Sequence, residues 1–393
     1  EPLDTSAIPR SINNEATKPD HKSAEYTETV ARCTGNDRFD AHPQANDWYE
    51  TIKLNYGIDY CDWGGRSNHF NPIPDTWHKM TDILLFWAAK GIDGFRCDMA
   101  EMVPHEFWKY ATEKVKAQYP HIVFIGEVYD PNQYRTYIAA GFDYLYDKVG
   151  MYDCLRNVMC EHRSANDITR QWQATDDISK HVLYFLENHD EQRIASNFFC
   201  GNMQKGIPAL IVAALFQCNP IMIYAGQEFG EKGMDGEGFS GIDGRSTIFD
   251  YWSIDAIRKG FFERSKLSAE QVQLEKEYRK ILTLCNSEKA ISNGKTFDLM
   301  YANETNDAFD SNKQFAFLRS SNNTTLLIVA NFSKTEAHIR VNIPAHAFDY
   351  MEIKEGKKNM VDLLSGNHQS VVLQKDSSIE IVVPALNGRV YKF

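Results

Sequence analysis

Short apolar runs alternate with amphipathic stretches between about residues 75 and 230. Five apolar runs have the length of strands and are bounded by turn residues: 92–97, 122–125, 142–146, 182–186 and 221–224. Between them, apolar residues recur with helical spacing at 77–90, 106–118 and 207–217. This alternation predicts βαβ units and a parallel sheet, and runs without polar alternation predict strands buried on both faces.

The pattern changes after a helical stretch at 269–285. β-rich runs follow at 314–319, 325–332, 338–343 and 378–383, with turn sequences and no helical pattern between them. We therefore predict three regions: an irregular polar segment at 1–50, a (β/α) barrel part at 51–286 and an all-β domain at 287–393. A closed (β/α)₈ barrel needs eight strands, and the apolar runs supply five of them.

Composition narrows the class of protein. The 393 residues include 42 Lys+Arg and 54 Asp+Glu, a formal net charge of −12. The hydrophobic content of 43% and the charged content of 24% are typical of globular proteins. The acidic balance argues against a nucleic-acid groove, and no apolar run reaches the ~18 residues of a membrane span. A neutral or cationic partner fits better, and a sugar is neutral.

The eight cysteines are scattered and form no CxxC pair, so a zinc or redox motif has little support. In a chain of this length they are predicted to be buried thiols rather than a disulfide framework. No leader sequence is visible at the first residues, although one could have been removed. The compartment stays open between cytoplasmic, periplasmic and secreted, with the cytoplasm slightly favoured, and the oligomeric state is not indicated.

Acidic residues follow three of the predicted strands. In GFRCD, strand alternation places Arg96 and Asp98 on the same side, and the guanidinium would keep the carboxylate ionised, as a nucleophile requires. In FIGEV, Glu127 follows an apolar strand, and a carboxyl beside an apolar wall can serve as a general acid. The alternatives are an Asp that caps the next helix and a Glu that reaches solvent.

The third acidic segment, at 186–193, places Asn188, His189 and Asp190 after an apolar strand. Its alternative interpretations are a fragment of a metal site and a helix N-cap. In a parallel α/β barrel, active sites form at the carboxyl ends of the strands, where all three segments would meet. Two carboxylates about 5–5.5 Å apart, one a nucleophile and one an acid, are the apparatus of a retaining glycosidase.

The segments GFRCD, FIGEV and ENHD, in this order after successive strands, resemble three conserved regions of the α-amylase family of glycoside hydrolases. The resemblance covers about 75–250, and the predicted β domain resembles the family's C-terminal domain. It implies a (β/α)₈ TIM-type barrel followed by a β-sandwich. It also implies retaining cleavage of α-1,4-glucosidic bonds in starch or maltooligosaccharides.

The resemblance assigns roles to individual residues. Asp98 matches the nucleophile that forms a β-glycosyl-enzyme, Glu127 the acid/base, and Asp190 the stabiliser of the transition state. Arg96 and His189 match residues that orient the nucleophile and hold substrate.

Four further residues are candidates for substrate contact. Glu101 stands where many α-amylases carry a Lys that contacts the aglycone side, so acceptor contacts differ here. Arg193 closes the third acidic segment. Tyr129, two residues after the acid, and Tyr224, at the last strand end, could stack on pyranose rings. The alternative for these aromatic residues is an ordinary place in the core.

The family's fourth motif, an Asp near Asn-His after the third strand, has no counterpart in 1–75. The chain therefore resembles the C-terminal part of a longer enzyme, with 1–50 similar to the B-domain segment. The missing motif often supplies a calcium ligand, so calcium is possible but not assignable, and no organic cofactor is expected. Two alternatives to a hydrolase stay open: a transglycosylase or isomerase of the same family, and a catalytically inactive chain that binds glucan.

Overall fold

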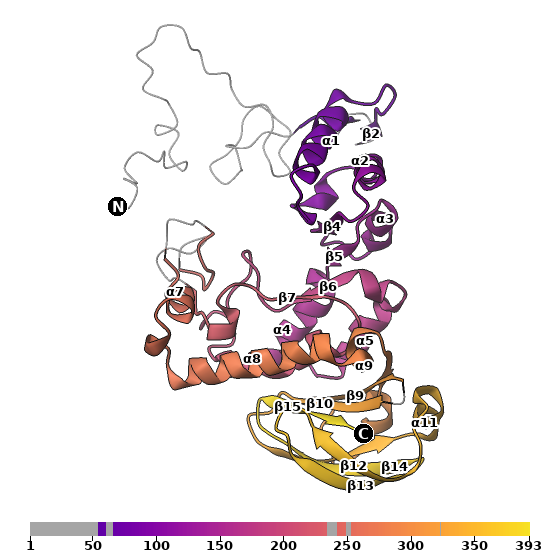
Figure 1. Ribbon diagram of the computed structural model, residues 1–393, viewed down its shortest axis with the longest axis vertical. Helices are drawn as coiled ribbons and strands as arrows, with labels where there is room; N and C mark the ends of the chain where they lie inside the picture. The colour runs from indigo at the N-terminus through magenta and orange to yellow at the C-terminus, as the bar shows by residue number, and fades with distance from the viewer. Residues whose placement is uncertain (1–53, 60–65, 234–241, 249–252, 323) are drawn as a thin grey trace. The chain divides into compact units, whose positions relative to one another are not determined.

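The computed structural model describes residues 54–59, 66–233, 242–248, 253–322 and 324–393 (Figure 1). The predicted irregular segment at 1–50 lies outside these residues. The chain divides into two compact units, which are described separately. The first unit comprises 1–124 and 139–142, and the second comprises 125–138 and 143–393.

The first unit packs two helices around aromatic side chains. Its elements are β1 (Ile58–Asp59), β2 (Ser67–Asn68), α1 (Asp75–Ala88), β3 (Gly94–Cys97), η2 (Ala100–Met102), α2 (His105–Gln118) and the start of β4 (Val123–Gly126). Trp77 of α1 meets Phe107 of α2 with ring centroids 5.9 Å apart. The indole of Trp108 donates to the carbonyl of Ala100 at 3.0 Å, which fixes the segment that follows β3.

The second unit contains the end of β4, β5 (Tyr144–Tyr146), β6 (Val182–Phe185) and β7 (Ile221–Met222). The pairs β4–β5, β5–β6 and β6–β7 are all parallel. The sheet order is β3-β4-β5-β6-β7, and the division between the units falls within β4. The predicted parallel strands are therefore present. All four residues of β6 are buried, as predicted, whereas β3 is only partly covered.

Helices and short turns lie between these strands and after the last of them. They are α3 (Tyr134–Ala139), η3 (Lys148–Tyr152), α4 (Asp153–Met159), α5 (Asp167–Ala174), η4 (Asp176–His181), η5 (Met203–Lys205), α6 (Gly206–Leu215), η6 (Gln227–Phe229), α7 (Asp255–Phe261), η7 (Arg264–Lys266) and α8 (Ala269–Ser287). All ten residues of α6 are buried, because this helix contacts α8 and also β10 and β15 of the C-terminal domain. A helix covered on every side needs no polar face. Among the described residues, no helix is both long and apolar enough to cross a membrane.

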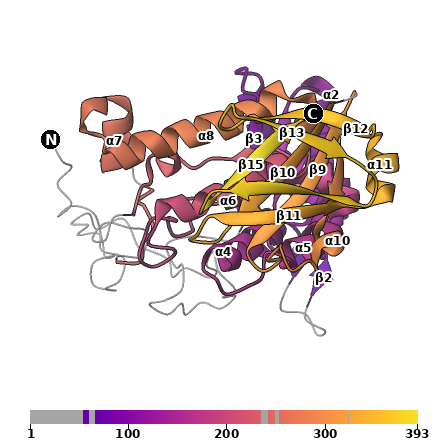
Figure 2. The same ribbon diagram turned by 90° about the horizontal axis from the view of Figure 1, so that it is seen from below.

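The C-terminal domain contains two antiparallel sheets. Its strands are β8 (Lys295–Asp298), β9 (Gln314–Ser321), β10 (Thr324–Asn331), β11 (Ala337–Ile343), β12 (Gly356–Asp362), β13 (His368–Leu373), β14 (Ser377–Val383) and β15 (Asn387–Lys392). The larger sheet has the order β13-β12-β15-β10-β9-β8, and β11 pairs with β14. Figure 2 shows β9, β10 and β15 running side by side. Contacts of β14 with β10, β13 and β15 join the two sheets into a sandwich.

The prediction that no helix interrupts this domain was wrong. Besides α9 (Lys289–Ser292) and α10 (Met300–Asn303), α11 (Ala345–Met351) lies between β11 and β12. It is only seven residues long, and its buried side chains, Ala347, Phe348 and Met351, are too few to reveal a helical period. The sequence also gave no sign of β12, because its GKKNMVD sequence is dominated by polar residues on the exposed face.

Candidate active site

In the first unit, Asp98 follows β3 directly. The Nη1 of Arg96 donates to Oδ1 of Asp98, so the two side chains form the ion pair that strand alternation predicts. The Asp98 side chain is 72% exposed and that of Arg96 28% exposed. Gly94, at the start of the same strand, has no room for a side chain, because an added Cβ would lie 2.4 Å from the carbonyl oxygen of Val123. Glu101 lies in η2 and is half-buried.

In the second unit, Glu127 is the first residue after β4 and is 5% exposed. The hydroxyl of Tyr129 donates to its Oε1 at 3.0 Å. Burial raises the pKa of the Tyr129 phenol, and the negative charges of Glu127 and Asp190 raise it further. Tyr129 therefore keeps its proton and remains a hydrogen-bond donor at neutral pH.

A tight turn after β6 presents His189 and Asp190. Oδ1 of Asn188 accepts hydrogen bonds from the backbone N–H groups of Asp190 and Glu191, both at 2.9 Å. This local arrangement is an Asx turn, in which a short side chain replaces a backbone acceptor. Nε2 of His189 lies 3.3 Å from Oδ2 of Asp190, and both side chains are about one-third exposed, at 34% and 32%. A donor and a carboxylate thus share an accessible edge.

Arg193 is completely buried and holds the base of this loop. Its guanidinium donates to Glu187 at 2.7 Å, to Ser246 at 2.7 Å and to the carbonyl of Ala225 at 2.9 Å. Its Cζ lies 3.9 Å from the centre of the Tyr224 ring. Burial raises the pKa of Glu187, and the charge of Arg193 opposes that effect. The geometry gives Arg193 a role in positioning Tyr224, and direct contact of Arg193 with substrate stays a prediction.

The sequence did not reveal a second layer of residues behind Asp190. Nζ of Lys148 lies 3.2 Å from Glu191, whose other oxygen accepts from the hydroxyl of Tyr152 at 3.0 Å. Arg156 of α4 donates to Tyr152 at 3.1 Å and to Gln192 at 2.5 Å. These contacts fix the residues that follow Asp190. The polar pair Asp147–Lys148, directly after the third predicted strand, was the available signal.

Asp147 is a further strand-end carboxyl that the sequence did not single out. It is 1% exposed and accepts from the backbone N–H of Met151 at 3.0 Å and the hydroxyl of Tyr134 at 3.1 Å. Burial raises its pKa to about 6, against the opposing effect of these hydrogen bonds. A Cβ added at Gly150 would lie 2.2 Å from Oδ1 of Asp147, so the turn requires glycine there.

The described residues contain no group of three or more His, Cys, Asp and Glu side chains arranged to hold a metal ion. A calcium site therefore stays a prediction, and no chemical step is assigned to one.

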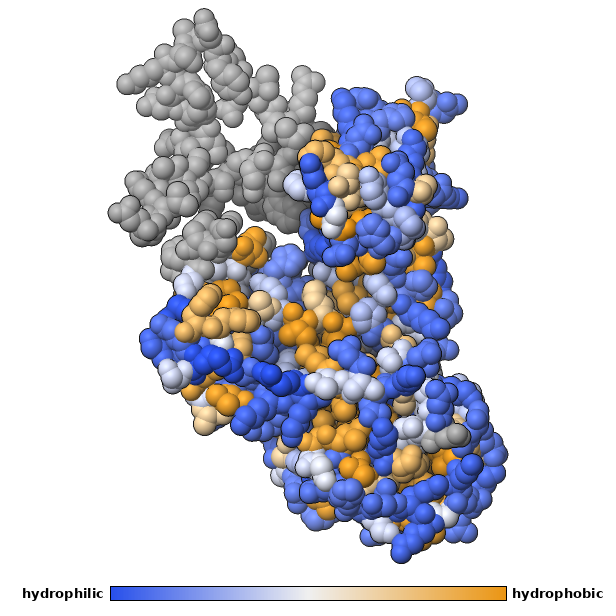
Figure 3. Space-filling model, viewed as in Figure 1, coloured by the Kyte–Doolittle hydropathy of each residue, from blue (hydrophilic) through white to orange (hydrophobic). Residues whose placement is uncertain are grey.

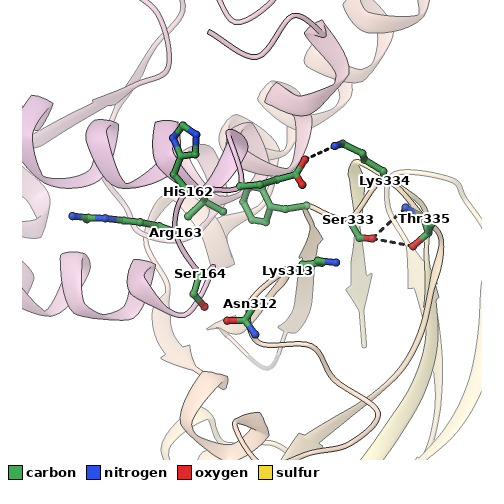
Figure 4. A pocket seen from close by; sticks show the side chains of 11 residues that line it. His162, Arg163, Ser164, Asn312, Lys313, Ser333, Lys334 and Thr335 are labelled. Carbon is green, nitrogen blue, oxygen red and sulfur yellow. Dashed lines mark hydrogen bonds and ion pairs between the residues drawn. The ribbon is translucent and has the colours of Figure 1, made fainter.

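A cavity of about 550 Å³ lies elsewhere in the second unit, between the end of α4 and the C-terminal domain (Figure 4). It contains none of the predicted site residues. Glu161 and Lys334 form an ion pair at its edge, with Nζ and Oε1 2.5 Å apart.

The visible face of the molecule is mostly hydrophilic with scattered apolar patches (Figure 3).

A family model for the alpha amylase catalytic domain matches residues 72–338, and one for the alpha amylase C-terminal all-beta domain matches 306–393. The sheet with acidic residues after its strands is thus the catalytic-domain fold of amylases, and the predicted fold class is confirmed. The chain belongs to the α-amylase family of glycoside hydrolases.

Individual relatives agree with this assignment. Alpha-amylase 3 of Dictyoglomus thermophilum is 23% identical over 330 residues, which cover 77% of this chain and 62% of that protein. An α-1,4-glucan:maltose-1-phosphate maltosyltransferase of Cereibacter sphaeroides is 32% identical over 92 residues, 22% of this chain and 16% of that protein. The crystal structure of an Anoxybacillus alpha-amylase matches with a TM-score of 0.62 at 19% identity, over 84% of this chain and 65% of that one. The chain therefore spans less than two-thirds of each of these relatives.

Proposed function

We propose that the protein is a retaining α-glucan hydrolase that cleaves α-1,4-glucosidic bonds of starch or maltooligosaccharides. The observation that carries the proposal is the arrangement in the second unit: a nearly buried Glu127 with a phenol donating to it, and an accessible His189–Asp190 pair after β6. The Arg96–Asp98 ion pair of the first unit supports the assignment of the nucleophile.

In the proposed mechanism, Asp98 attacks the anomeric carbon while Glu127 protonates the departing glycosidic oxygen. The bond to the leaving sugar breaks and a β-glycosyl-enzyme forms on Asp98. Glu127, now a carboxylate, removes a proton from water, which attacks the same carbon and frees Asp98. Asp190 stabilises the positive charge that develops on the sugar in both transition states.

Each supporting residue has a physical task. Arg96 keeps Asp98 ionised, because the adjacent positive charge favours the carboxylate. Tyr129 holds the Glu127 carboxyl in one orientation through its hydroxyl. His189 would donate to sugar hydroxyls, and the Tyr224 ring, backed by Arg193, would offer an apolar face to a pyranose.

A transglycosylase is the second candidate, favoured by the similarity to a maltosyltransferase over 92 residues. Both activities share the glycosyl-enzyme and differ in whether water or a sugar hydroxyl attacks it. Hydrolysis in the presence of excess maltose would yield only shorter products. A transferase would yield products longer than the starting glucan.

Proton NMR of maltoheptaose during the first minutes of reaction tests the proposal. We expect the α-anomer to appear first, and no product from an Asp98→Asn variant that still binds the glucan. An initial β-anomer would contradict the retaining mechanism. Binding without turnover in the unaltered chain would support the alternative of an inactive glucan-binding chain.

A further inference from the structure

Two cysteines that are distant in the sequence lie together behind the candidate active-site loop. The sulfur atoms of Cys160 and Cys200 are 3.7 Å apart, although the residues are 40 positions apart in the chain. Cys160 caps the C-terminal end of α4, and Cys200 lies in the turn at 196–201. Both are partly exposed free thiols. The sequence prediction of buried thiols is therefore wrong for this pair, because both side chains are only partly buried.

Both cysteines are connected to the segment that carries Asp190. The backbone N–H of Cys200 donates to the carbonyl of Ile194 at 3.2 Å, one residue after the buried Arg193. On the other side, Arg156, one turn before Cys160 in α4, donates to Gln192 at 2.5 Å. A covalent bond between the two sulfurs would enclose residues 160–200, and with them the loop that carries Asp190, in a covalent ring.

The surroundings of Cys160 favour its thiolate. Its hydrogen bond with the Cys200 thiol lowers the pKa of Cys160 below the usual value, burial opposes this effect, and the positive charge of Arg156 lowers the pKa further. His162 and Lys205 add to this effect, although Lys205 also lies 3.5 Å from the carboxylate of Glu161. The thiolate is the nucleophile in thiol–disulfide exchange.

Other cysteines of the described residues behave differently. Burial raises the pKa of Cys97 and of Cys154 to about 12, and that of Cys285 to about 11. These thiols stay protonated near neutral pH and are poor nucleophiles. Cys160 should therefore be more reactive than these three thiols. The next two residues, Glu161 and His162, line the cavity of Figure 4, so this part of the chain borders a space that a small molecule can enter.

We propose that Cys160 and Cys200 form a reversible disulfide by exchange with a low-molecular-weight disulfide such as oxidised glutathione, and that this bond ties the end of α4 to the turn after the candidate active-site loop. The sulfurs need only move from 3.7 Å to the ~2.05 Å of a disulfide.

The exchange balances in two steps. The Cys160 thiolate attacks one sulfur of oxidised glutathione, which forms a mixed disulfide and releases one glutathione thiolate. Cys200 then loses its proton, which the released thiolate can accept, and attacks the Cys160 sulfur. The second glutathione leaves as a thiolate and takes up a proton from solvent. Two protein thiols are oxidised and one glutathione disulfide is reduced to two thiols.

The test incubates the full chain with oxidised glutathione at pH 7.5, quenches it with acid and maps the peptides by mass spectrometry. We expect a cross-linked Cys160–Cys200 peptide pair that excess reduced glutathione reverses. Cys200→Ser should stop at the mixed disulfide on Cys160, whereas the control Cys218→Ser should still cross-link. The map scores Cys33 and Cys61, which lie outside the described residues, separately.

A second set of measurements uses only the unaltered chain, so it does not depend on whether a variant folds. Alkylation of the reduced chain by iodoacetamide should modify Cys160 before Cys97, Cys154 or Cys285, and its rate should level off at a lower pH than theirs. Hydrogen exchange of residues 194–201 should slow several-fold on oxidation, while that of β9 and β10 stays unchanged. A stable mixed disulfide at Cys160 without a cross-link in the unaltered chain, or faster alkylation of Cys154 than of Cys160, would overturn the proposal.

Discussion

Two buried carboxylates show how differently the parallel sheet and the C-terminal β domain use charge. Asp362 in β12 is 1% exposed and accepts from Ser365, Arg389 and two backbone N–H groups. Glu127, at 5% exposure, follows a four-residue strand and accepts from the hydroxyl of Tyr129 at 3.0 Å.

The C-terminal β domain mainly contributes stability, and the parallel sheet carries the proposed catalytic residues. The strands β9 and β10 have eight residues each and are buried along almost their entire length. In their domain, Asp362 accepts hydrogen bonds from residues of the same domain, whereas the buried Arg319 of β9 also donates to the carbonyl of Phe216 outside it. The parallel strands have two to four residues, and three of them, β3, β4 and β5, are followed directly by a carboxyl side chain, Asp98, Glu127 and Asp147 respectively. We therefore expect substitutions in the C-terminal β domain to change the free energy of unfolding, and substitutions of Asp98, Glu127 and Asp190 after the parallel strands to change turnover.

The largest expected effect is that of Glu127→Gln. Loss of the acid should lower kcat on maltoheptaose by about 10²–10⁴-fold, since the leaving oxygen is no longer protonated. Glycosyl fluorides have a good leaving group without protonation, so the first step with them should stay nearly unchanged. Stopped-flow release of fluoride measures that step. An equal loss on both substrates would contradict the acid role.

Asp362→Asn provides the opposite case in the β domain. It removes the anion that Arg389 faces at 3.1 Å, and we expect the free energy of unfolding to fall by about 2–4 kcal/mol. The kcat per folded molecule should not change. Urea unfolding measures the loss, and Asp349→Asn, at a 68% exposed carboxylate paired with Lys375, is the matched control with an expected change below about 0.5 kcal/mol. A lower kcat of Asp362→Asn under conditions where it is fully folded would contradict the expectation that the β domain affects stability alone.

Asp147 makes stability depend on pH. Its folded-state pKa of about 6 lies above the ordinary value of 3.8, so the fold favours the protonated form. This contribution is fully present below about pH 4 and is lost as pH rises towards 6. The loss is on the order of 2–3 kcal/mol. We take the free energy of unfolding of Asp147→Asn minus that of the unaltered chain. This difference should therefore be larger at pH 7 than at pH 4 by the same amount. Urea unfolding at both pH values measures this difference, and the same difference at pH 4 and pH 7 would contradict the raised pKa of Asp147.

The smallest effect is expected for Tyr129→Phe. It keeps the ring but removes the hydroxyl that donates to Glu127 and orients its carboxyl, a loss of about 1 kcal/mol for one hydrogen bond, or roughly fivefold in kcat/KM. Tyr301→Phe, which removes a hydroxyl bonded to His346 in the β domain, is the control and should leave kcat/KM unchanged. Equal values for Tyr129→Phe and the unaltered chain would show that the hydroxyl does not support Glu127.

The features that could be predicted from the sequence are those that depend on residues close together in the chain. The five parallel strands and the pairing of Arg96 with Asp98 follow from apolar runs and strand alternation. The contacts of Arg156 with Gln192 and of Cys160 with Cys200 join positions 36 and 40 residues apart, and no local pattern encodes them. For the same reason, the burial of Arg193 by Ser246 and Ala225 appears only when distant segments pack together.

The most direct test of the account is to trap the glycosyl-enzyme. A fluorinated maltosyl fluoride that slows deglycosylation should leave one glycosyl group on the protein, and peptide mapping by mass spectrometry should locate it on Asp98. The Asp98→Asn variant should carry no label. A label on another carboxylate, or turnover of maltoheptaose with no label at all, would contradict the assignment of Asp98 as the nucleophile.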